Sequence, residues 1–166
     1  GGTVNIYATT GAINITGNAS SPAIGLLNNG GTMNIGTNGT TTTSGTVTFS
    51  VDSLSFALGT TTVSGTGGLV LKPATTGATI GVGTGNGTLT LPSSWFTGTS
   101  VFKNGFSAIV LGASDAGNIT VGGANTFVDN VTLLSGTNIT LNAGANITNT
   151  QSDAYIALAA TGNFIN

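Results

Sequence analysis

Charged residues are nearly missing from this sequence, whose 166 residues include two Lys or Arg, four Asp or Glu and no His. Neither Glu nor Arg occurs. The side chains that carry a charge at neutral pH are therefore Lys72, Lys103, Asp52, Asp115, Asp129 and Asp153. Binding to nucleic acid depends on Lys and Arg side chains that neutralise phosphates. Two lysines against four aspartates exclude that class of function.

Cysteine is absent as well as histidine. Without these residues the chain has no ligands for zinc, iron–sulfur or haem sites, and no disulfide can hold the fold. General acid–base catalysis most often uses His, Glu or a buried Lys. We therefore expect no enzyme activity, no catalytic residue, no cofactor and no metal site.

Long apolar runs are also missing. No stretch approaches the roughly 18 residues of a membrane-spanning helix, so we expect no transmembrane segment. Disorder accompanies low hydrophobicity and high net charge, whereas this chain is 39% hydrophobic and has a formal net charge of −2. The composition therefore predicts an ordered fold, and the length suits one domain.

A short repeat fills the chain: an apolar residue, any residue, a second apolar residue, and then a turn of Gly, Asn, Thr or Ser. Alternation with a period of two places both apolar side chains on one face of a strand. Thr, Asn, Gly and Val also disfavour helices. The repeat therefore predicts short β-strands. Its apolar pairs include Val4/Ile6, Ile13/Ile15, Ile24/Leu26, Met33/Ile35, Val47/Phe49, Leu69/Leu71, Ile80/Val82, Leu89/Leu91, Ile109/Leu111, Ile119/Val121, Val131/Leu133, Ile139/Leu141 and Ile156/Leu158.

The spacing of these units favours an all-β parallel β-helix, or β-solenoid, over a sandwich or a barrel. Units follow one another at about 8–12 residues, and most turns lack the Asn-Gly signal of a hairpin. Three units make a triangular rung of roughly 20–30 residues, so the chain would hold roughly six to eight rungs. A right-handed winding is expected because parallel crossovers almost always have that hand. Asn118, Asn138 and Asn146 at recurrent corners predict amide ladders.

We expect residues 1–166 to form a single solenoid segment, as a fragment or repeat unit of a longer fibre. Two stretches interrupt the rhythm. Residues 37–46 are the low-complexity run TNGTTTTSGT, and residues 92–107 are PSSWFTGTSVFKNGFS. We expect both to be loops or irregular rungs, since Pro92 has no N–H to give to a strand ladder.

From about Ser53 to Asn166 the chain resembles the repeat region of filamentous-haemagglutinin-type proteins, the very large exoproteins of bacterial two-partner secretion. The most specific pieces are TIGVG at 79–83, NGFSAIVLG at 104–112, SDAG at 114–117 and NITLNAGANIT at 138–148. The resemblance implies a right-handed parallel β-helix within a long exported fibre. It also implies adhesion, aggregation, biofilm formation or contact-dependent growth inhibition. The family's N-terminal secretion domain, with its asparagine-rich export motif, is not visible here.

The aspartates offer little for catalysis or metal binding, because consecutive ones are separated by 63, 14 and 24 positions. Asp115 and Asp129 are shorter than a full rung apart and need not share a face. Turn-making or capping is the expected role of both, since Asp side chains accept hydrogen bonds from nearby backbone N–H groups. An acid cluster on a β-helix that acts on polysaccharide remains an alternative function.

The aromatic interruption is the candidate contact surface. If its loop projects, Trp95, Phe96, Phe102 and Lys103 would offer a platform for a sugar ring or a partner protein. The alternative, which we favour, is a wide rung whose interior needs large side chains.

Two further patterns have ordinary explanations. The pairs Thr46/Thr48 and Thr88/Thr90 would suit an ice-binding solenoid only if they repeated on one face of every rung. Asn-x-Ser/Thr glycosylation sequences arise wherever a turn Asn precedes a strand Ile-Thr. They occur at Asn14, Asn18, Asn38, Asn86, Asn118, Asn130, Asn138 and Asn146.

The sequence thus favours a structural and adhesive segment of an extracellular bacterial fibre or cell-surface filament. The expected partners are further copies, joined end to end, and host-cell or matrix glycans and proteins. Enzyme action on polysaccharide and ice binding are the alternatives.

Overall fold

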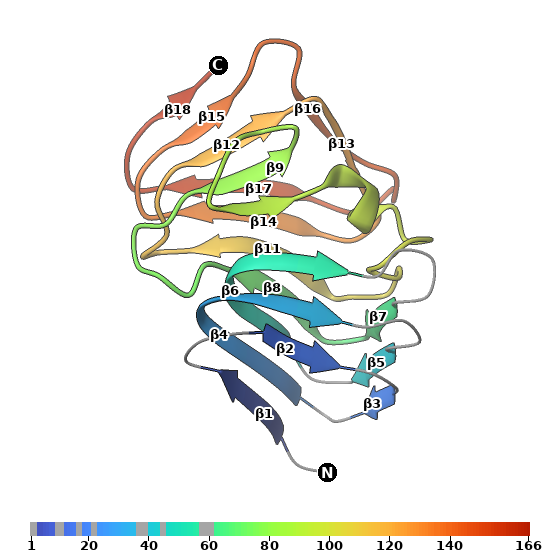
Figure 1. Cartoon of the computed structure of the whole chain (residues 1–166). Coiled ribbons are helices and arrows are strands. Elements are labelled where there is room, and N and C mark those ends of the chain that lie inside the picture. The colour runs from blue at the N-terminus through green and yellow to red at the C-terminus, as the bar shows by residue number, and fades with distance from the viewer. Residues whose placement is uncertain are drawn as a thin grey trace.

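The computed structural model describes residues 3–8, 12–15, 18–20, 23–35, 40–43, 46–56 and 62–166, with side chains from residue 46 onward. All of the strand pairings in these ranges are parallel. The prediction of an all-β chain with parallel strands is confirmed. The strands are stacked in layers from the N-terminal to the C-terminal end (Figure 1).

The largest sheet has eight strands in the order β1-β4-β6-β8-β11-β14-β17, with β2 also paired to β4. We call it the first sheet. Its strands are β1 (Thr3–Ala8), β2 (Ala12–Ile15), β4 (Ala23–Ile35), β6 (Val47–Phe56), β8 (Gly68–Lys72), β11 (Ala108–Ala113), β14 (Val131–Ser135) and β17 (Ile156–Ala160).

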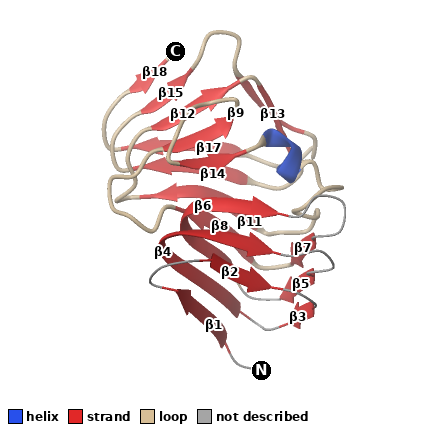
Figure 2. Ribbon diagram, viewed as in Figure 1, coloured by secondary structure: helices blue, strands red, loops and turns tan. Residues whose placement is uncertain are grey.

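A second sheet has the order β10-β9-β12-β15-β18, and two small sheets join β3-β5-β7 and β13-β16. The strands of the second sheet are β9 (Ile80–Gly83), β10 (Leu89–Leu91), β12 (Ile119–Gly122), β15 (Ile139–Leu141) and β18 (Phe164–Ile165). The small sheets hold β3 (Asn18–Ser20), β5 (Thr40–Thr43), β7 (Thr62–Gly65), β13 (Ala124–Phe127) and β16 (Asn146–Asn149). A 3-10 helix, η1 (Ser93–Phe96), is the blue segment in Figure 2.

The chain visits these sheets in a repeating order, which we call a circuit. From β11 it passes to β12 in the second sheet, then to β13, and returns to the first sheet as β14, which pairs with β11. The next circuit runs through β15 and β16 to β17. Ile109 therefore pairs with Val131 and Val131 with Ile156, 22 and 25 positions later along the chain.

Apolar side chains of successive circuits lie over one another because the register keeps the period-two pattern aligned. In the first sheet Phe49, Leu71, Leu111 and Leu133 occupy equivalent positions, and all four are fully buried. In the second sheet Ile80, Ile119 and Ile139 do the same. Together with the neighbouring columns, these residues form one continuous apolar core.

Residues 84–107 depart from the regular circuit. After β9 the chain turns back through residues 84–88 and returns as β10, which pairs with β9 in parallel on the side away from β12. Leu89 N donates to Thr79 O at 3.0 Å. The next first-sheet strand, β11, therefore pairs with β8 only after a long excursion, with Leu69 opposite Ile109.

Corner asparagines form a ladder of a different kind from the predicted amide stacking. The Asn118 Oδ1 accepts a hydrogen bond from Asn138 N at 3.3 Å, and the Asn138 Oδ1 accepts one from Asn163 N at 2.7 Å. Each side chain thus ties its corner to the backbone of the next circuit. Asn146 lies in strand β16 and does not join this ladder.

One predicted loop contains a strand. Within residues 37–46, Thr40–Thr43 form β5, which pairs with β3 and β7. A run of β-branched Thr is favourable in an extended strand. Residues 37–39 and 44–45 lie outside the described residues. In residues 92–107 the described structure is η1 followed by isolated bridges at Gly98, Phe102 and Lys103.

Candidate functional site

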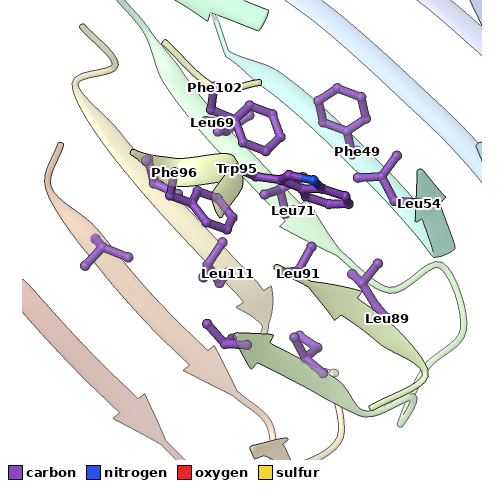
Figure 3. Close-up of a cluster of buried hydrophobic side chains, with 14 of the residues drawn as sticks. Phe49, Leu54, Leu69, Leu71, Leu89, Leu91, Trp95, Phe96, Phe102 and Leu111 are labelled. Carbon is purple, nitrogen blue, oxygen red and sulfur yellow. The ribbon is translucent and has the colours of Figure 1, made fainter. Parts of the chain in front are cut away.

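The residues predicted to form a contact surface are mostly inside the protein. Trp95 is 5%, Phe96 0% and Phe102 1% exposed. Figure 3 shows these three rings among Phe49 and the core leucines. The prediction of a projecting platform is therefore wrong for these three aromatic residues. Their burial agrees with the favoured alternative, in which large side chains fill the interior.

Backbone pairing explains why these rings point inward. Val63 N donates to Val101 O at 2.8 Å, and Lys103 N donates to Val63 O at 2.9 Å. Residues 101–103 thus extend the small sheet of β7, and this pairing holds Val101 and Phe102 in the core, at 2% and 1% exposed. Lys103 is only partly buried, and its Nζ donates to Thr99 O at 2.7 Å.

The structure brings together two other ionisable residues that the sequence analysis left apart. Asp129 follows β13 and Asp153 follows β16, so each lies just before a strand of the first sheet. Both line a pocket of about 220 Å³. Its lining residues are Phe106, Ser107, Asp129, Asn130, Gln151, Asp153 and Ala154. We call it the corner pocket, because it spans the corners that precede β11, β14 and β17.

Hydrogen bonds between circuits build the walls of the corner pocket. The Asn130 Nδ2 donates to Ser107 O at 3.0 Å, and its Oδ1 accepts from Tyr155 N at 3.0 Å. Gln151 Nε2 donates to Asn104 Oδ1 at 2.9 Å. The Asn130 amide therefore links the corners that precede β11, β14 and β17. The Gln151 amide links the corner before β17 to Asn104.

Asp129 is the most constrained group in the pocket. It is 6% exposed, and its Oδ1 accepts a hydrogen bond from Gly105 N at 3.0 Å. Its Oδ2 is buried and has no hydrogen-bond partner among the described residues. Burial raises the pKa of Asp129 above its ordinary value, against the opposing effect of the nearby backbone N–H groups of Gly105 and Phe106.

Asp153, in contrast, is exposed in the turn before β17. No lysine lines the pocket. Two carboxylates, one buried and one in water, are the kind of pair that acid–base chemistry on sugars uses. The pocket also supplies the oxygen acceptors that a positively charged or hydrogen-donating ligand requires. Within the described residues, no group of three or more His, Cys, Asp or Glu side chains gathers around one point.

The spacing of the two aspartates is the signal that would have found this pocket. Asp129 and Asp153 are 24 positions apart, one fewer than the 25 positions between the paired residues Val131 and Ile156. Residues one circuit apart lie over one another in the stack. The sequence shows the separation, but the length of a circuit comes from the structure.

The remaining candidates lie apart from the corner pocket. Asp115 is exposed in a turn after β11. Asp52 caps the loop after β8, where its Oδ1 accepts from Ala74 N and Thr75 N, each at 2.9 Å. Thr48 belongs to the first sheet and Thr90 to the second, so the two Thr pairs do not share one face.

The Asn-x-Ser/Thr positions have mixed surroundings. Asn86, Asn118 and Asn146 are exposed, whereas Asn130 and Asn138 are partly buried. Asn14 and Asn18 lie in β2 and β3, where only the backbone is described, and Asn38 lies outside the described residues. The amides of Asn118, Asn130 and Asn138 already bond to neighbouring corners, which gives these residues a structural role.

The raised pKa of Asp129 has a consequence for stability. The folded chain holds this proton more tightly than the unfolded chain, so folding is favoured while Asp129 is protonated. We expect the free energy of unfolding of the wild type to fall, relative to that of Asp129→Asn, as pH rises from about 4 toward 7. Urea titrations at several pH values, in buffer free of divalent cations, measure this difference. A difference that does not change with pH would contradict it.

Comparisons with known proteins identify no relative of this chain. No protein-family model, no curated protein and no solved structure matches it. In the part of the chain that the structure describes, no helix has the length and apolar character needed to cross a membrane.

Proposed function

We propose that this chain is a structural and adhesive segment of an extracellular bacterial fibre or cell-surface filament, and that it acts through surface contact and self-association rather than catalysis. The proposed form is a right-handed, three-sided parallel β-solenoid. The path of seven strands through the first sheet supports it, since successive members are connected by way of other sheets. This arrangement suits a rod that binds other molecules along its extended outer surface rather than in a pocket.

The observation that carries the proposal is the exposed apolar surface of the last circuit. The large apolar residues that remain exposed among residues 46–56 and 62–166 all lie in or beside β17 and β18. They are Tyr155 at 49%, Ile156 at 39%, Leu158 at 36%, Phe164 at 55% and Ile165 at 48%. Ile156, Leu158 and Phe164 continue the buried columns of Val131, Leu133 and Ile139. Among the described residues, no further circuit lies over them.

The backbone at this end is equally open. Among the described strands, β17 pairs only with β14 and β18 only with β15. At the opposite end of the first sheet, β1 pairs with β4 and with no other strand that the structure describes. Free edges of parallel strands are templates for further pairing. The occupant we propose is a second copy of this chain, its β1 edge set on the β17 edge, which repeats without closing and gives a filament.

Low charge favours the same contact. With six charged side chains and a formal net charge of −2, copies repel one another weakly. We also propose that the uncharged surface of Thr and Asn side chains binds host-cell or matrix glycans and proteins.

Sedimentation over a range of concentrations tests the self-association. We expect the wild type to form larger species as its concentration rises. Leu158→Lys and Phe164→Lys should each weaken the association about fivefold or more, because half-burial of one such side chain contributes roughly 1 kcal/mol. Thr90→Lys, which adds the same charge at an exposed position of β10, is the matched control. A wild type that stays monomeric at millimolar concentration would overturn the proposal.

A further inference from the structure

We propose that the corner pocket is a binding site for a hard divalent cation, with Ca²⁺ as the best-matched ion. The inference is independent of self-association. It begins with Asp129 Oδ2, a carboxylate oxygen that is buried and has no partner among the described residues. A buried polar atom without a hydrogen bond costs about 1–3 kcal/mol, and more if it is charged, so such an atom calls for a partner such as an ordered water or an ion.

Charge determines the kind of group. Asp153 lines the same pocket, and neither Lys72 nor Lys103 does. Burial takes the Asp129 carboxylate out of water, which disfavours its charged form. A positive charge in the pocket relieves this cost, whereas a neutral sugar does not. Phe106 is 4% exposed, so the pocket also lacks the open aromatic face on which sugar rings stack.

The side-chain atoms of the pocket that could coordinate a metal ion are all oxygens. Gln151 uses its Nε2 to bond Asn104, which leaves its Oε1 as an acceptor. Ser107 adds a hydroxyl and Asp153 adds a carboxylate. Asn130 has both ends of its amide engaged, so it positions the corner and is not a ligand. The chain contains no His or Cys, so the pocket cannot supply the nitrogen and sulfur ligands that softer metals prefer.

Calcium suits this set better than magnesium does. Ca²⁺ accepts about six to eight oxygen ligands in flexible geometry, whereas Mg²⁺ demands a near-ideal octahedron. A pocket of about 220 Å³ has room for an ion and several waters, each of which occupies about 30 Å³ in the liquid. Four protein groups from three corners, completed by water, would make a weak site.

A bound ion would act as a clamp. Ser107 precedes β11, Asp129 precedes β14, and Gln151 and Asp153 precede β17. The ion would therefore tie the last circuit, which carries the exposed apolar residues, to the two circuits before it. We expect calcium to stabilise that circuit most.

Calorimetric titration of the full chain with CaCl₂, at constant ionic strength, tests the proposal. We expect one ion per chain with a dissociation constant of about 10⁻⁴–10⁻³ M, the range of extracellular calcium modules, and a higher Tm with CaCl₂ than with matched NaCl. Asp129→Asn should weaken binding about tenfold or more, and Asp153→Asn several-fold. Asp115→Asn removes the same charge from an exposed turn and should bind as the wild type does.

Three results would overturn the site. The first is no saturable binding and no Tm shift up to about 10 mM CaCl₂, well above the expected range. The second is wild-type affinity in both Asp129→Asn and Asp153→Asn. The third is an equal loss in Asp115→Asn, which would mean a general effect of charge. Because Asp153 is exposed, its variant keeps the test valid even if Asp129→Asn folds poorly.

Discussion

Phe102→Ala is expected to lower the free energy of unfolding by about 3–5 kcal/mol, the usual cost of removing a buried aromatic ring. Phe102 lies at the centre of the aromatic cluster. Its ring centroid is 5.3 Å from that of Phe96, 5.4 Å from Phe56 and 6.2 Å from Phe49. The cavity cannot be filled easily, because Phe49 and Phe56 are held in the paired strand β6.

Urea denaturation followed by Trp95 fluorescence measures this loss, since the ring centroids of Trp95 and Phe102 are 6.3 Å apart. Tyr155→Ala is the matched control: it removes an aromatic ring that is 49% exposed. We expect that variant to change stability by about 0.5 kcal/mol at most. A similar loss in the two variants would mean that the aromatic interior does not contribute as described.

Gly85→Ala is the second change with a large expected effect. The return loop of residues 84–88 lies against the outward side of β9 and β12. A Cβ on Gly85 would overlap the carbonyl oxygen of Thr120 and lie 2.7 Å from its carbonyl carbon. These are backbone atoms of a paired strand, and they cannot move without breaking the second sheet. We expect a loss of about 3 kcal/mol, at the upper end for overpacking.

The control for this effect is Gly68→Ala, in the first strand position of β8. There the atoms nearest to an added Cβ belong to the side chain of Thr46, the first of them at 3.4 Å. Thermal unfolding of the two variants, side by side, separates steric overlap from the general effect of adding a methyl group. Equal Tm values for Gly85→Ala and Gly68→Ala would show that the loop does not lie against the sheet.

The calcium and self-association proposals concern adjacent parts of the last circuits but fail separately. Asp129→Asn removes a pocket ligand without changing the exposed apolar residues, and Phe164→Lys changes β18 without changing the pocket. If calcium binds to a chain that stays monomeric, the pocket is a site and the end is not a contact surface. If copies associate without binding calcium, the end is a contact surface and the corner pocket is not a calcium site.

Side-chain alternation carried most of the fold information in the sequence. Leu69 and Leu71, Ile109 and Leu111, and the other apolar pairs predict strands because a strand alternates its two faces whatever its neighbours are. Absences were equally informative, since a chain without His, Cys, Glu or Arg is restricted to a narrow range of chemistry. For Thr40–Thr43, composition suggested a loop although the β-branched side chains favour the strand that forms.

Only the tertiary structure decided which segments lie side by side. Ile109 and Val131 are 22 positions apart and Val131 and Ile156 are 25, whereas Leu69 and Ile109 are 40 apart because β10 and η1 intervene. Circuit length thus varies, and no local pattern records it. The inward aromatic rings and the meeting of Asp129 with Asp153 both depend on it. Alternation is a property of each strand alone, but stacking is a property of the whole chain.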